Sequence, residues 1–391
     1  MPYGSRMHPL DDLAGKHVVF LSWRDTRNPE GGGAERYLEK VAGGLAALGC
    51  RVTILCAAHA AAPPDETVDG VHYVRRGSKI TVYLRGMLAL ATRRLGRVDL
   101  VVDVQNGLPF FSRLVTRAPV VVLVHHVHRE QWGVLFGPLM ARVGWWIERR
   151  FAPWLYRRCQ YVAVSRATRA ELAELGVDPR RVAVVHNGTD RVVRVDETKA
   201  PEPTIAVVGR LVPHKQVEHA VDAVVALRAE HPGIHLEVVG NGWLGGEPPR
   251  VRRRARRDLV TFHGHVEEHT KHEVYARSWL LALPSIKEGW GLVIGEAAMH
   301  ATPTVAYSSA GGTRESVRAD VTGLLVDDQD GLTAAIDRLV RDHDLRARLG
   351  TAALAMSHSY TWEHAQESFG VVVLAALEGR VIDAQDPDEG A

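Results

Sequence analysis

The sequence contains few cysteines and no C-x-x-C pair. Only Cys50, Cys56 and Cys159 occur in 391 residues, and an odd number of separated thiols argues against a disulfide framework. The first residues, MPYGSRMHPL, lack the apolar run of a signal peptide, and no apolar stretch approaches the roughly 20 residues that span a bilayer. We therefore expect a protein of the reducing cytoplasm.

An excess of charge of one sign is also missing. Lys and Arg total 48 and Asp and Glu total 46, which gives a formal net charge of +2 and predicts no broad affinity for nucleic acid. One basic cluster, RVRRRARR at residues 250–257, would suit nucleic acid, although the exposed face of a helix explains it more simply. With 46% hydrophobic residues, the chain can bury a core in each of two halves.

Short Val- and Leu-rich runs alternate with segments of helical spacing along the chain. The first half begins this rhythm with HVVFLS at residues 17–22, and the second half restarts it with TIAVVGRL at residues 204–211. Between the halves, the polar and proline-rich residues 196–203 predict a linker. This pattern is typical of parallel sheets covered by helices on both faces. We expect two doubly wound α/β halves, with the chemistry in the loops that follow the strands.

Two of these loops are suited to phosphate. In the first half, SWRDTRNPEGGGAER places Gly31, Gly32 and Gly33 before a helix, where backbone can approach an anion closely. The loop is not a G-x-G-x-x-G fingerprint, and an ordinary flexible loop would also use glycine. In the second half, Arg210 and Lys215 follow a strand, where two cations could clamp a diphosphate or could simply be exposed surface charges.

The segment EGWGLVIGE, residues 288–296, puts one carboxylate on each side of a glycine–tryptophan–glycine turn. Glu296 is expected in the first turns of a helix, where an acid favours the helix dipole. That explanation suits one acid but accounts less well for Glu288 across the turn. Carboxylates readily accept hydrogen bonds from paired sugar hydroxyls, so both glutamates are candidates for binding a ligand.

Three histidines, His125, His126 and His128, crowd the loop after another strand. Their spacing does not match the usual zinc patterns, so a histidine that contacts a ligand hydroxyl is the better interpretation. A further segment, GWWIERRFAPWLYRR at residues 144–158, mixes tryptophans and arginines. It predicts either a helix at the surface of a membrane or a helix with its aromatic residues in the core.

These motifs occur in the order found in one known family. The chain resembles the retaining glycosyltransferases of GT-B type known as family 4, or glycosyl transferases group 1, from about His17 to about Phe369. The Glu-x7-Glu element is the most specific motif. The full set comprises Gly32–Gly33, His125, SRAT (165–168), HNGTD (186–190), GRLVPHK (209–215), FHGHV (262–266), EGWGLVIGE (288–296) and GGTRE (311–315).

The resemblance implies an α/β chain of the GT-B fold, in which two Rossmann-like domains face each other across a cleft. Residues 1–198 would bind the acceptor and residues 199–365 the nucleotide sugar. Residues 366–391 would supply a helix that crosses back to the N-terminal domain and then a disordered tail. The expected protein is a monomer or homodimer that needs no metal and no cofactor besides its donor substrate. It would be cytoplasmic, with residues 144–158 as the candidate contact with the inner face of the membrane.

Carried over by residue, the resemblance implies that Arg210 and Lys215 hold the diphosphate, with Gly32 and Gly33 approaching it from the other domain. Glu296 would take the ribose hydroxyls. Val266 would meet the base through its backbone, and His125 would contact the sugar near its reacting carbon, with His126 as the adjacent alternative. Sugar and phosphate oxygens would be held by Glu288 and by the N–H groups of Gly289, Trp290, Gly291 and Leu292. The acceptor would meet His126, His128 and Asn106.

Three positions depart from the family pattern. Gln216 follows Lys215 where glycine is common, so a turn with positive φ would be strained there. Trp290 replaces a frequent phenylalanine, as expected for an aromatic wall, and His186 replaces a proline.

The expected reaction is transfer of a sugar from a nucleoside-diphosphate sugar to an acceptor hydroxyl with retention of configuration. Suitable acceptors include a lipid-linked glycan, a polysaccharide precursor and a small natural product. The catalytic residues would be His125, Arg210, Lys215 and Glu288. Two alternatives remain open at this stage: a GT-B nucleotide-sugar epimerase and a non-catalytic nucleotide-sugar-binding protein.

Overall fold

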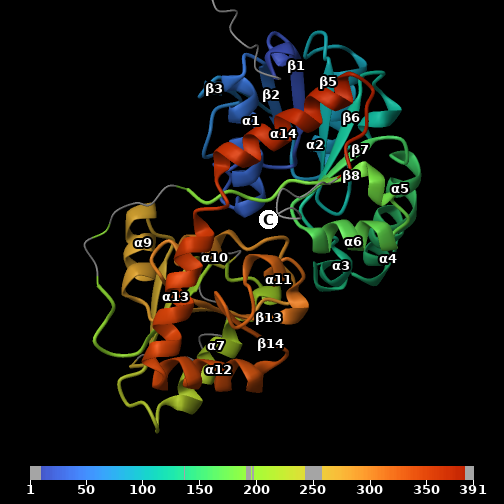
Figure 1. The fold of residues 1–391 in the computed structure, drawn as a ribbon. Helices are drawn as coiled ribbons and strands as arrows, with labels where there is room; N and C mark the ends of the chain where they lie inside the picture. Colours follow the sequence, from blue (N-terminus) through green and yellow to red (C-terminus); the bar gives the residue numbers. More distant parts are fainter. Residues whose placement is uncertain (1–9, 136, 191–194, 196–197, 243–257, 384–391) are drawn as a thin grey trace, which may run out of the picture. The chain divides into compact units, whose positions relative to one another are not determined.

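The computed structural model describes residues 10–135, 137–190, 195, 198–242 and 258–383 (Figure 1). The basic cluster at 250–257 and the predicted tail at 384–391 lie outside these residues. The chain divides into two compact units. Unit 1 combines Met1–Asn187 with Trp362–Ala391, and unit 2 is Gly188–Thr361. The divisions therefore fall at 187/188 and 361/362, where the sequence suggested 198/199 and 365/366. The Trp362–Ala391 segment returns to the first unit.

Unit 1 is built on an eight-stranded sheet in the order β3-β4-β2-β1-β5-β6-β7-β8. The strands are β1 (His17–Leu21), β2 (Arg51–Cys56), β3 (Asp65–Val68), β4 (Val71–Arg75), β5 (Leu100–Gln105), β6 (Val120–Val124), β7 (Gln160–Ala163) and β8 (Val182–Val184). The helices are α1 (Gly33–Ala47), α2 (Thr81–Ala91), α3 (Arg129–Leu135), α4 (Pro138–Trp146), α5 (Ala152–Leu155), α6 (Arg166–Glu174) and α14 (Trp362–Leu377). A π-helical turn, Ile147–Phe151, joins α4 to α5, and short 3-10 turns occur at Asp11–Leu13, Ser112–Leu114 and Pro179–Arg181.

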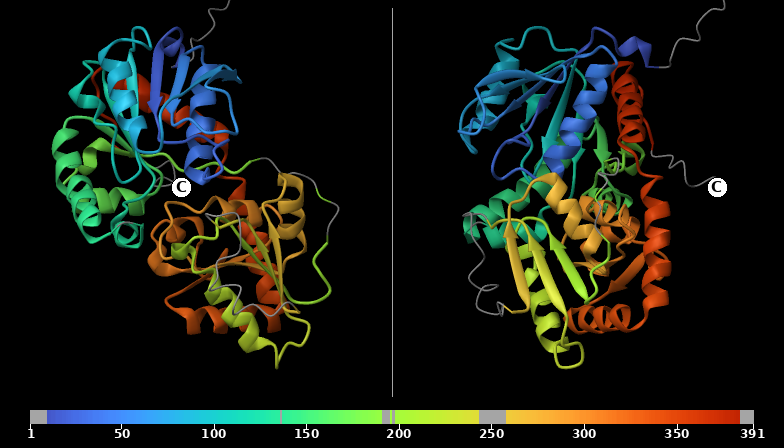
Figure 2. Two further views of the ribbon diagram at one scale, coloured as in Figure 1. Left: turned by 180° about the vertical axis from the view of Figure 1, so that it is seen from behind. Right: turned by 90° about the vertical axis from the view of Figure 1, so that its left-hand side faces the viewer.

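Helices cover both faces of this sheet. Successive side chains of a strand point to opposite sides, so the apolar strand β1 has side chains to bury on each face. Val19 and Leu21 of β1 join an apolar cluster with residues of α2, α5 and α6. Phe20, between them, stacks on Phe369 of α14 with ring centroids 6.0 Å apart. The two views of Figure 2 show α14 running beside α1, so residues from opposite ends of the chain close one face of the same sheet.

One edge of the unit 1 sheet differs from the all-parallel prediction. β3 pairs antiparallel with β4 through a tight turn at Asp69 and Gly70, which have φ values of 48° and 79°. An Asp-Gly pair favours this hairpin turn, because both of its central residues need positive φ. The sequence signal was present, but the short polar strand DETV did not read as part of a buried sheet.

Unit 2 contains a six-stranded parallel sheet in the order β11-β10-β9-β12-β13-β14. Its strands are β9 (Thr204–Val208), β10 (His235–Val239), β11 (Val260–Gly264), β12 (Leu280–Leu283), β13 (Thr304–Tyr307) and β14 (Gly323–Val326). Its helices are α7 (Val217–Leu227), α9 (Glu268–Arg277), α10 (Leu292–Ala298), α11 (Thr313–Ser316), α12 (Gln329–Arg341) and α13 (His343–Ser357), with 3-10 turns at Pro213–Lys215 and Ser308–Ala310.

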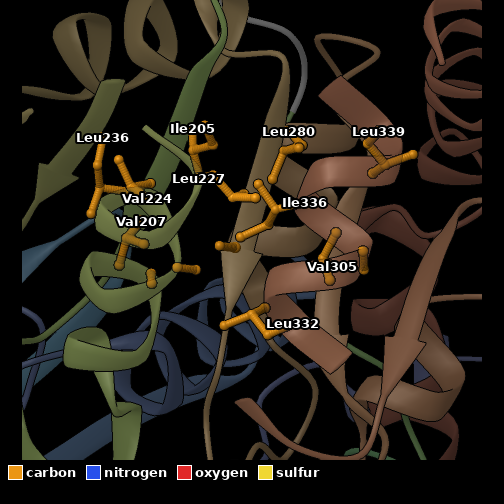
Figure 3. Close-up of a cluster of buried hydrophobic side chains, with 14 of the residues drawn as sticks. Ile205, Val207, Val224, Leu227, Leu236, Leu280, Val305, Leu332, Ile336 and Leu339 are labelled. Carbon is orange, nitrogen blue, oxygen red and sulfur yellow. The ribbon is translucent and has the colours of Figure 1, made fainter. Parts of the chain in front are cut away.

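The main core of unit 2 lies between this sheet and the pair α7 and α12. Figure 3 shows Val224 and Leu227 of α7 and Leu332 and Ile336 of α12 packed against side chains of the strands, among them Ile205. A smaller cluster on the opposite face joins α9 and α10 to β9 and β12. Among the helices that the structure describes, none is long and apolar enough to cross a membrane.

Candidate functional site

Each sheet has a point where the strand order reverses, and open α/β sheets bind ligands beyond the carboxyl ends of the strands at such points. In unit 2 the chain goes outward from β9 to β10 and β11 and then returns to β12 on the other side of β9. In unit 1 the reversal lies between β1 and β5. The loops that follow β9 and β12 in unit 2, and β1 and β5 in unit 1, contain most of the predicted site residues.

Lys215 and Glu288 meet across the reversal point of unit 2. The Lys215 ammonium forms an ion pair with Glu288 Oε1, although 73 residues separate the two in sequence. Their side chains are only 19% and 10% exposed. A backbone hydrogen bond of 2.8 Å from Ile286 N–H to the His214 carbonyl also ties the two loops together. Two residues that the sequence assigned to the diphosphate and to the sugar, Lys215 and Glu288, are therefore in direct contact, and both side chains are largely buried.

Arg210 lies half-buried directly after β9, and its carbonyl accepts a hydrogen bond of 2.9 Å from Val212 N–H. Gln216 then adopts φ 45° and ψ 42°, the left-handed conformation in which a glycine would be expected, and α7 begins at Val217. A side chain in this conformation costs roughly 1 kcal/mol. The chain therefore keeps the turn after Lys215 despite the unfavourable residue.

The turn of the EGWG segment is held by the GGTRE segment. Glu288 N–H donates to the Ala310 carbonyl at 2.7 Å, and Gly312 N–H donates to the Glu288 carbonyl at 3.0 Å. A Cβ atom on Gly312 would lie 2.0 Å from the Gly289 carbonyl oxygen, so only glycine fits there. The two segments thus form one rigid wall in which Glu288 is 9% exposed.

Trp290 does not form the aromatic wall that the sequence suggested. Its indole is 5% exposed and packs edge-on against Tyr360, with centroids 4.9 Å apart, while its carbonyl accepts from Ser316 Oγ at 2.7 Å. The side chain anchors the turn inside unit 2. The predicted role in ligand binding remains with the backbone of Gly289 to Leu292, because the first N–H groups of helix α10 have no acceptor within the helix.

Glu296 is held by two residues that sequence reasoning missed. Lys271 Nζ donates to Glu296 Oε1 at 3.0 Å and Tyr275 OH donates to Oε2 at 2.8 Å. Both donors lie on α9, four residues apart, and burial raises the pKa of Tyr275 well above its usual value, so the phenol stays protonated. Glu296 therefore does not pair with the Lys215–Glu288 site directly. Val266, just before α9, packs its side chain on the cluster beneath, which leaves its backbone for the predicted contact.

In unit 1 the glycine loop is braced by a buried ion pair. Glu35, in the first turn of α1, accepts from Gly32 N–H at 2.8 Å, which satisfies the backbone donor at the N-cap of the helix. Arg24 Nε lies 2.6 Å from Glu35 Oε1, and both side chains are buried. The N–H of Gly32, predicted to approach a phosphate, is thus engaged by Glu35. Gly33 is the first residue of α1, and its predicted approach to the diphosphate remains untested.

His125 is buried at the end of β6, edge-on to the Tyr37 ring with centroids 5.3 Å apart. Its carbonyl accepts from Thr168 Oγ1 at 3.0 Å, which fixes the backbone. Burial, helped by the nearby charges of His128 and Arg24, lowers the pKa of His125 to about 3, so the imidazole is neutral at physiological pH. Its Nε2 atom is buried and has no hydrogen-bond partner among the described residues. Such atoms are rare in folded proteins, so Nε2 is a candidate for binding a ligand.

The other predicted acceptor residues divide into two groups. His126 Nε2 lies 3.0 Å from Gln131 Nε2. His128 Nδ1 approaches Glu148 Oε1 to 3.4 Å but has no hydrogen-bond partner among the described residues. Asn106, after β5, has a buried Nδ2 atom without a partner among the described residues. The neighbouring Gln105 Oε1 is likewise unpaired there. In the part of the chain that the structure describes, no cluster of three His, Cys, Asp or Glu side chains is suited to a metal ion.

The two halves of the chain match two different family models. Residues 31–192 match the model described as Glycosyltransferase Family 4, and residues 190–356 match Glycosyl transferases group 1. The chain belongs to the family 4 type of GT-B glycosyltransferases. The Glu-x7-Glu element of the chain runs from the buried Glu288 to Glu296, which Lys271 and Tyr275 hold.

Several curated relatives are about a third identical to this chain over an aligned stretch of roughly 240 residues. A D-inositol 3-phosphate glycosyltransferase of Nocardia farcinica is 32% identical over 237 residues, which cover 55% of this chain and 52% of that protein. A glycogen synthase of Mycobacterium tuberculosis is 31% identical over 240 residues, which cover 58% and 56%. The chain thus spans about half the length of the curated relatives it matches.

Solved structures share the fold over nearly the whole chain. Sucrose-phosphate synthase from Thermosynechococcus elongatus has a TM-score of 0.74 at 19% identity and covers 93% of this chain and 99% of its own. Anabaena HepE, solved in complex with UDP and glucose, has a TM-score of 0.72 at 19% identity and covers 92% and 100%. These likenesses confirm the predicted GT-B fold.

Proposed function

We propose that this chain is a retaining glycosyltransferase that moves a sugar from a nucleoside-diphosphate sugar to an acceptor hydroxyl without a metal ion. The observation that supports this most is the Lys215–Glu288 contact at the reversal point of the unit 2 sheet. It places a fixed ammonium, and a carboxylate able to accept from sugar hydroxyls, in one spot of a sheet edge suited to nucleotides.

The proposed chemistry requires charge to be stabilised in two places. As the bond between the sugar carbon and the diphosphate oxygen breaks, negative charge grows on the diphosphate and positive charge on the sugar. Arg210 and Lys215 would stabilise the leaving diphosphate more strongly in the transition state than in the ground state. The acceptor hydroxyl would attack from the same face, forming the new bond, while a leaving phosphate oxygen takes its proton.

The ion pair gives Lys215 a defined position before the donor arrives. Glu288 holds the ammonium close to the wall formed by EGWG and GGTRE, so little conformational entropy remains to be lost on binding. In the proposed complex the ammonium is shared between Glu288 and the diphosphate, while Glu288 also accepts from a sugar hydroxyl. Glu296, braced by Lys271 and Tyr275, would accept from the ribose.

His125 would act as a hydrogen-bonding group and not as an acid. With its pKa lowered to about 3, the imidazole stays neutral at physiological pH and can pair with a sugar hydroxyl through its free Nε2. Asn106 is proposed to meet the acceptor in the same way, through its unpaired Nδ2. His126 is a weaker candidate for the acceptor because its Nε2 already lies 3.0 Å from Gln131 Nε2, whereas His128 stays a candidate.

The relatives suggest which substrates to test first. HepE was solved with UDP, with UDP and glucose, and with UDP-glucose, so UDP-sugars lead the list of proposed donors. An inositol phosphate glycosyltransferase and a glycogen synthase are both named for polyhydroxylated acceptors. We accordingly propose a polyhydroxylated acceptor, in the free form or as part of a glycan.

A thermal-shift screen of UDP-, GDP-, ADP- and dTDP-sugars would identify the donor. Release of the nucleoside diphosphate, measured with acceptor mixtures and with EDTA, would then test transfer without metal.

We expect Lys215→Ala to lower turnover about 10²-fold or more, the effect of losing one preorganised charge at the leaving group. Lys16→Ala, an exposed lysine of unit 1, is the matched control and should leave turnover unchanged. Normal turnover by Lys215→Ala would refute the assignment, as would conversion of the donor to an epimer without acceptor, or donor binding without turnover.

A further inference from the structure

The segment from α4 to α5, whose place in unit 1 can be followed in Figure 1, exposes several large apolar side chains. The sequence left open whether its tryptophans enter the core. Trp145 does pack against the core of unit 1, but Trp146 and Trp154 are each 58% exposed. The same segment exposes Leu139, Met140 and Val143. Tryptophan is usually well buried, so two exposed indoles beside three exposed aliphatic chains form an unusual surface.

A π-helical turn aligns the aromatic rings of this surface. In such a turn residues five apart become neighbours, and Trp146 stacks on Phe151 with centroids 6.1 Å apart and planes inclined by 12°. Phe151 in turn stacks on Trp154 at 5.8 Å. The three rings form a continuous strip, which we call the aromatic strip, in line with the aliphatic side chains of α4.

The inner face of the segment is fixed to unit 1, so the aromatic strip has a defined orientation. Trp132 packs so closely on α4 that a Cβ atom on Gly144 would lie 2.2 Å from its Cζ3 atom. Its Nε1 donates to the buried Glu148 carboxylate at 2.6 Å. Because Glu148 also accepts from His128 N–H at 3.0 Å, the helix cannot roll to bury the strip without breaking this network.

Basic side chains surround the aromatic strip, and their charges are not cancelled locally. Glu148 is the only acidic residue between positions 138 and 158, and it is buried. Five arginines of the segment are exposed, and within the described part of the chain none of them forms an ion pair: Arg142, Arg149, Arg150, Arg157 and Arg158. The surface therefore combines apolar side chains with uncompensated positive charge.

We propose that this surface binds a membrane that contains anionic lipids, with the aromatic strip in the interface between headgroups and acyl chains. Indole rings favour that interface, and arginines near them gain from the negative potential of the lipid headgroups. A second copy of the chain fits less well, because a symmetric dimer through this face would place five arginines against five. The inference is independent of the proposed glycosyl transfer, and it explains why the strip is exposed.

Vesicle flotation of the full chain tests this directly. We expect binding to vesicles of phosphatidylcholine with 30% phosphatidylglycerol and weaker binding to phosphatidylcholine alone. Binding should also weaken as NaCl rises, because salt screens the attraction between exposed arginines and anionic lipids. The double variant Trp146→Ala/Trp154→Ala should lose at least about tenfold in partitioning. Arg149→Gln/Arg150→Gln should lose roughly 25-fold, at about fivefold for each charge.

Another exposed apolar face of unit 1 supplies the matched control. Helix α2 exposes Leu84 and Leu88 but no tryptophan, so Leu84→Ser/Leu88→Ser should float like the wild-type chain. Circular dichroism and thermal melting confirm that each variant is folded. The proposal is overturned if the wild-type chain does not float with anionic vesicles or if folded Trp146→Ala/Trp154→Ala floats equally well. It is also overturned if the tryptophan pair is instead needed for a dimer in ultracentrifugation.

Discussion

The two sheets of this chain reverse their strand order in the same way but place opposite chemistry at the reversal point. In unit 2 the loops after β9 and β12 bring the Lys215 ammonium and the Glu288 carboxylate into contact, and both side chains are largely buried. In unit 1 the ion pair of Arg24 and Glu35 serves the helix cap. The neighbouring strands β5 and β6 are followed by neutral groups that have no hydrogen-bond partner among the described residues, such as His125 Nε2. Similar topology therefore does not imply a similar ligand.

The difference agrees with a division of labour between the units. A diphosphate needs fixed cations, whereas a neutral hydroxyl needs unpaired donors and acceptors in a dry site. Under the proposed function, unit 2 supplies the first and unit 1 the second. Each prediction below alters one side of this comparison.

The largest effect should come from separating the two members of the unit 2 ion pair. Lys215→Ala removes the ammonium but also leaves Glu288 buried without its partner, which by itself would repel a diphosphate. We expect the double variant Lys215→Ala/Glu288→Gln to remain about 10²-fold or more below the wild-type turnover, because the cation on the leaving group is still missing.

Steady-state turnover of the two single variants and the double variant, with the donor found by thermal shift, measures this cycle. Recovery of turnover in the double variant would mean that Lys215 only neutralises Glu288. The proposed contact with the leaving group would then be wrong, although the family assignment would stand.

A methyl group at Gly312 should force the unit 2 wall apart. Gly312 has φ −60°, which suits alanine, so Gly312→Ala acts only through the 2.0 Å approach of its Cβ to the Gly289 carbonyl. We expect turnover to fall about tenfold or more and the stability of unit 2 to fall by roughly 1–3 kcal/mol, the usual cost of overpacking. Urea titration and turnover assays measure the two effects.

The matched control is Gly43→Ala in helix α1 of unit 1, where no atom lies within 4 Å of the added Cβ. Alanine there should stabilise the chain by roughly 0.5–1 kcal/mol and leave turnover unchanged. Wild-type turnover and stability in Gly312→Ala would show that the wall formed by EGWG and GGTRE is flexible.

The neutral side of the comparison can be tested by pH. Folding lowers the pKa of His125 from about 6.5 to about 3, so below pH 6.5 the unfolded chain binds a proton that the folded chain does not. Holding His125 neutral therefore costs no stability above pH 6.5, and the free energy of unfolding falls as the pH drops from 6.5 towards 3. The loss amounts to several kcal/mol at about 1.4 kcal/mol per pKa unit.

Urea titrations of the wild-type chain and of His125→Phe between pH 4 and 7 measure this loss. We expect a flatter pH dependence in the variant. His343→Gln, an exposed histidine, should keep the wild-type slope. Parallel slopes for the wild-type chain and His125→Phe would mean that His125 is not held neutral by burial.

The smallest effect concerns the bracing of Glu296. Tyr275→Phe removes the phenol that donates to Oε2 while the ion pair with Lys271 remains. We expect the donor KM to rise by roughly threefold to tenfold, in line with one hydrogen bond to a charged group, with kcat within about twofold. Tyr161→Phe is the matched control, because that buried hydroxyl has no partner among the described residues. A fall in kcat at constant KM would contradict a role limited to donor binding.

The sequence carried much of the fold because the buried strands are continuous apolar runs and helix ends are marked. Gly49, for example, adopts φ 83° just after α1, as its position after the helical pattern predicted. The β3–β4 hairpin was missed because its outer strand is polar and mostly exposed, although the Asp-Gly turn was readable. The short strand β14 was missed as well.

The site was predictable as a set of positions but not as a set of contacts. Sequence order places Lys215 and Glu288 in loops after strands, yet only the strand order shows that these strands are neighbours. The burial of the Trp290 indole and the bracing of Glu296 by α9 depend on packing between elements far apart in sequence, which residue spacing does not encode. The bond from Gly32 N–H to Glu35 was readable, since a glutamate three residues after the N-cap commonly accepts from it.

The contact between Phe20 and Phe369 bears on the order in which the chain becomes able to fold. On a ribosome, all of unit 2 is synthesised after strand β1 of unit 1 and before helix α14, which packs on that strand. Until α14 emerges, one apolar face of the unit 1 sheet stays open to water or to chaperones. We therefore expect nascent chains that end near residue 361 to carry a folded unit 2 behind an unfinished unit 1.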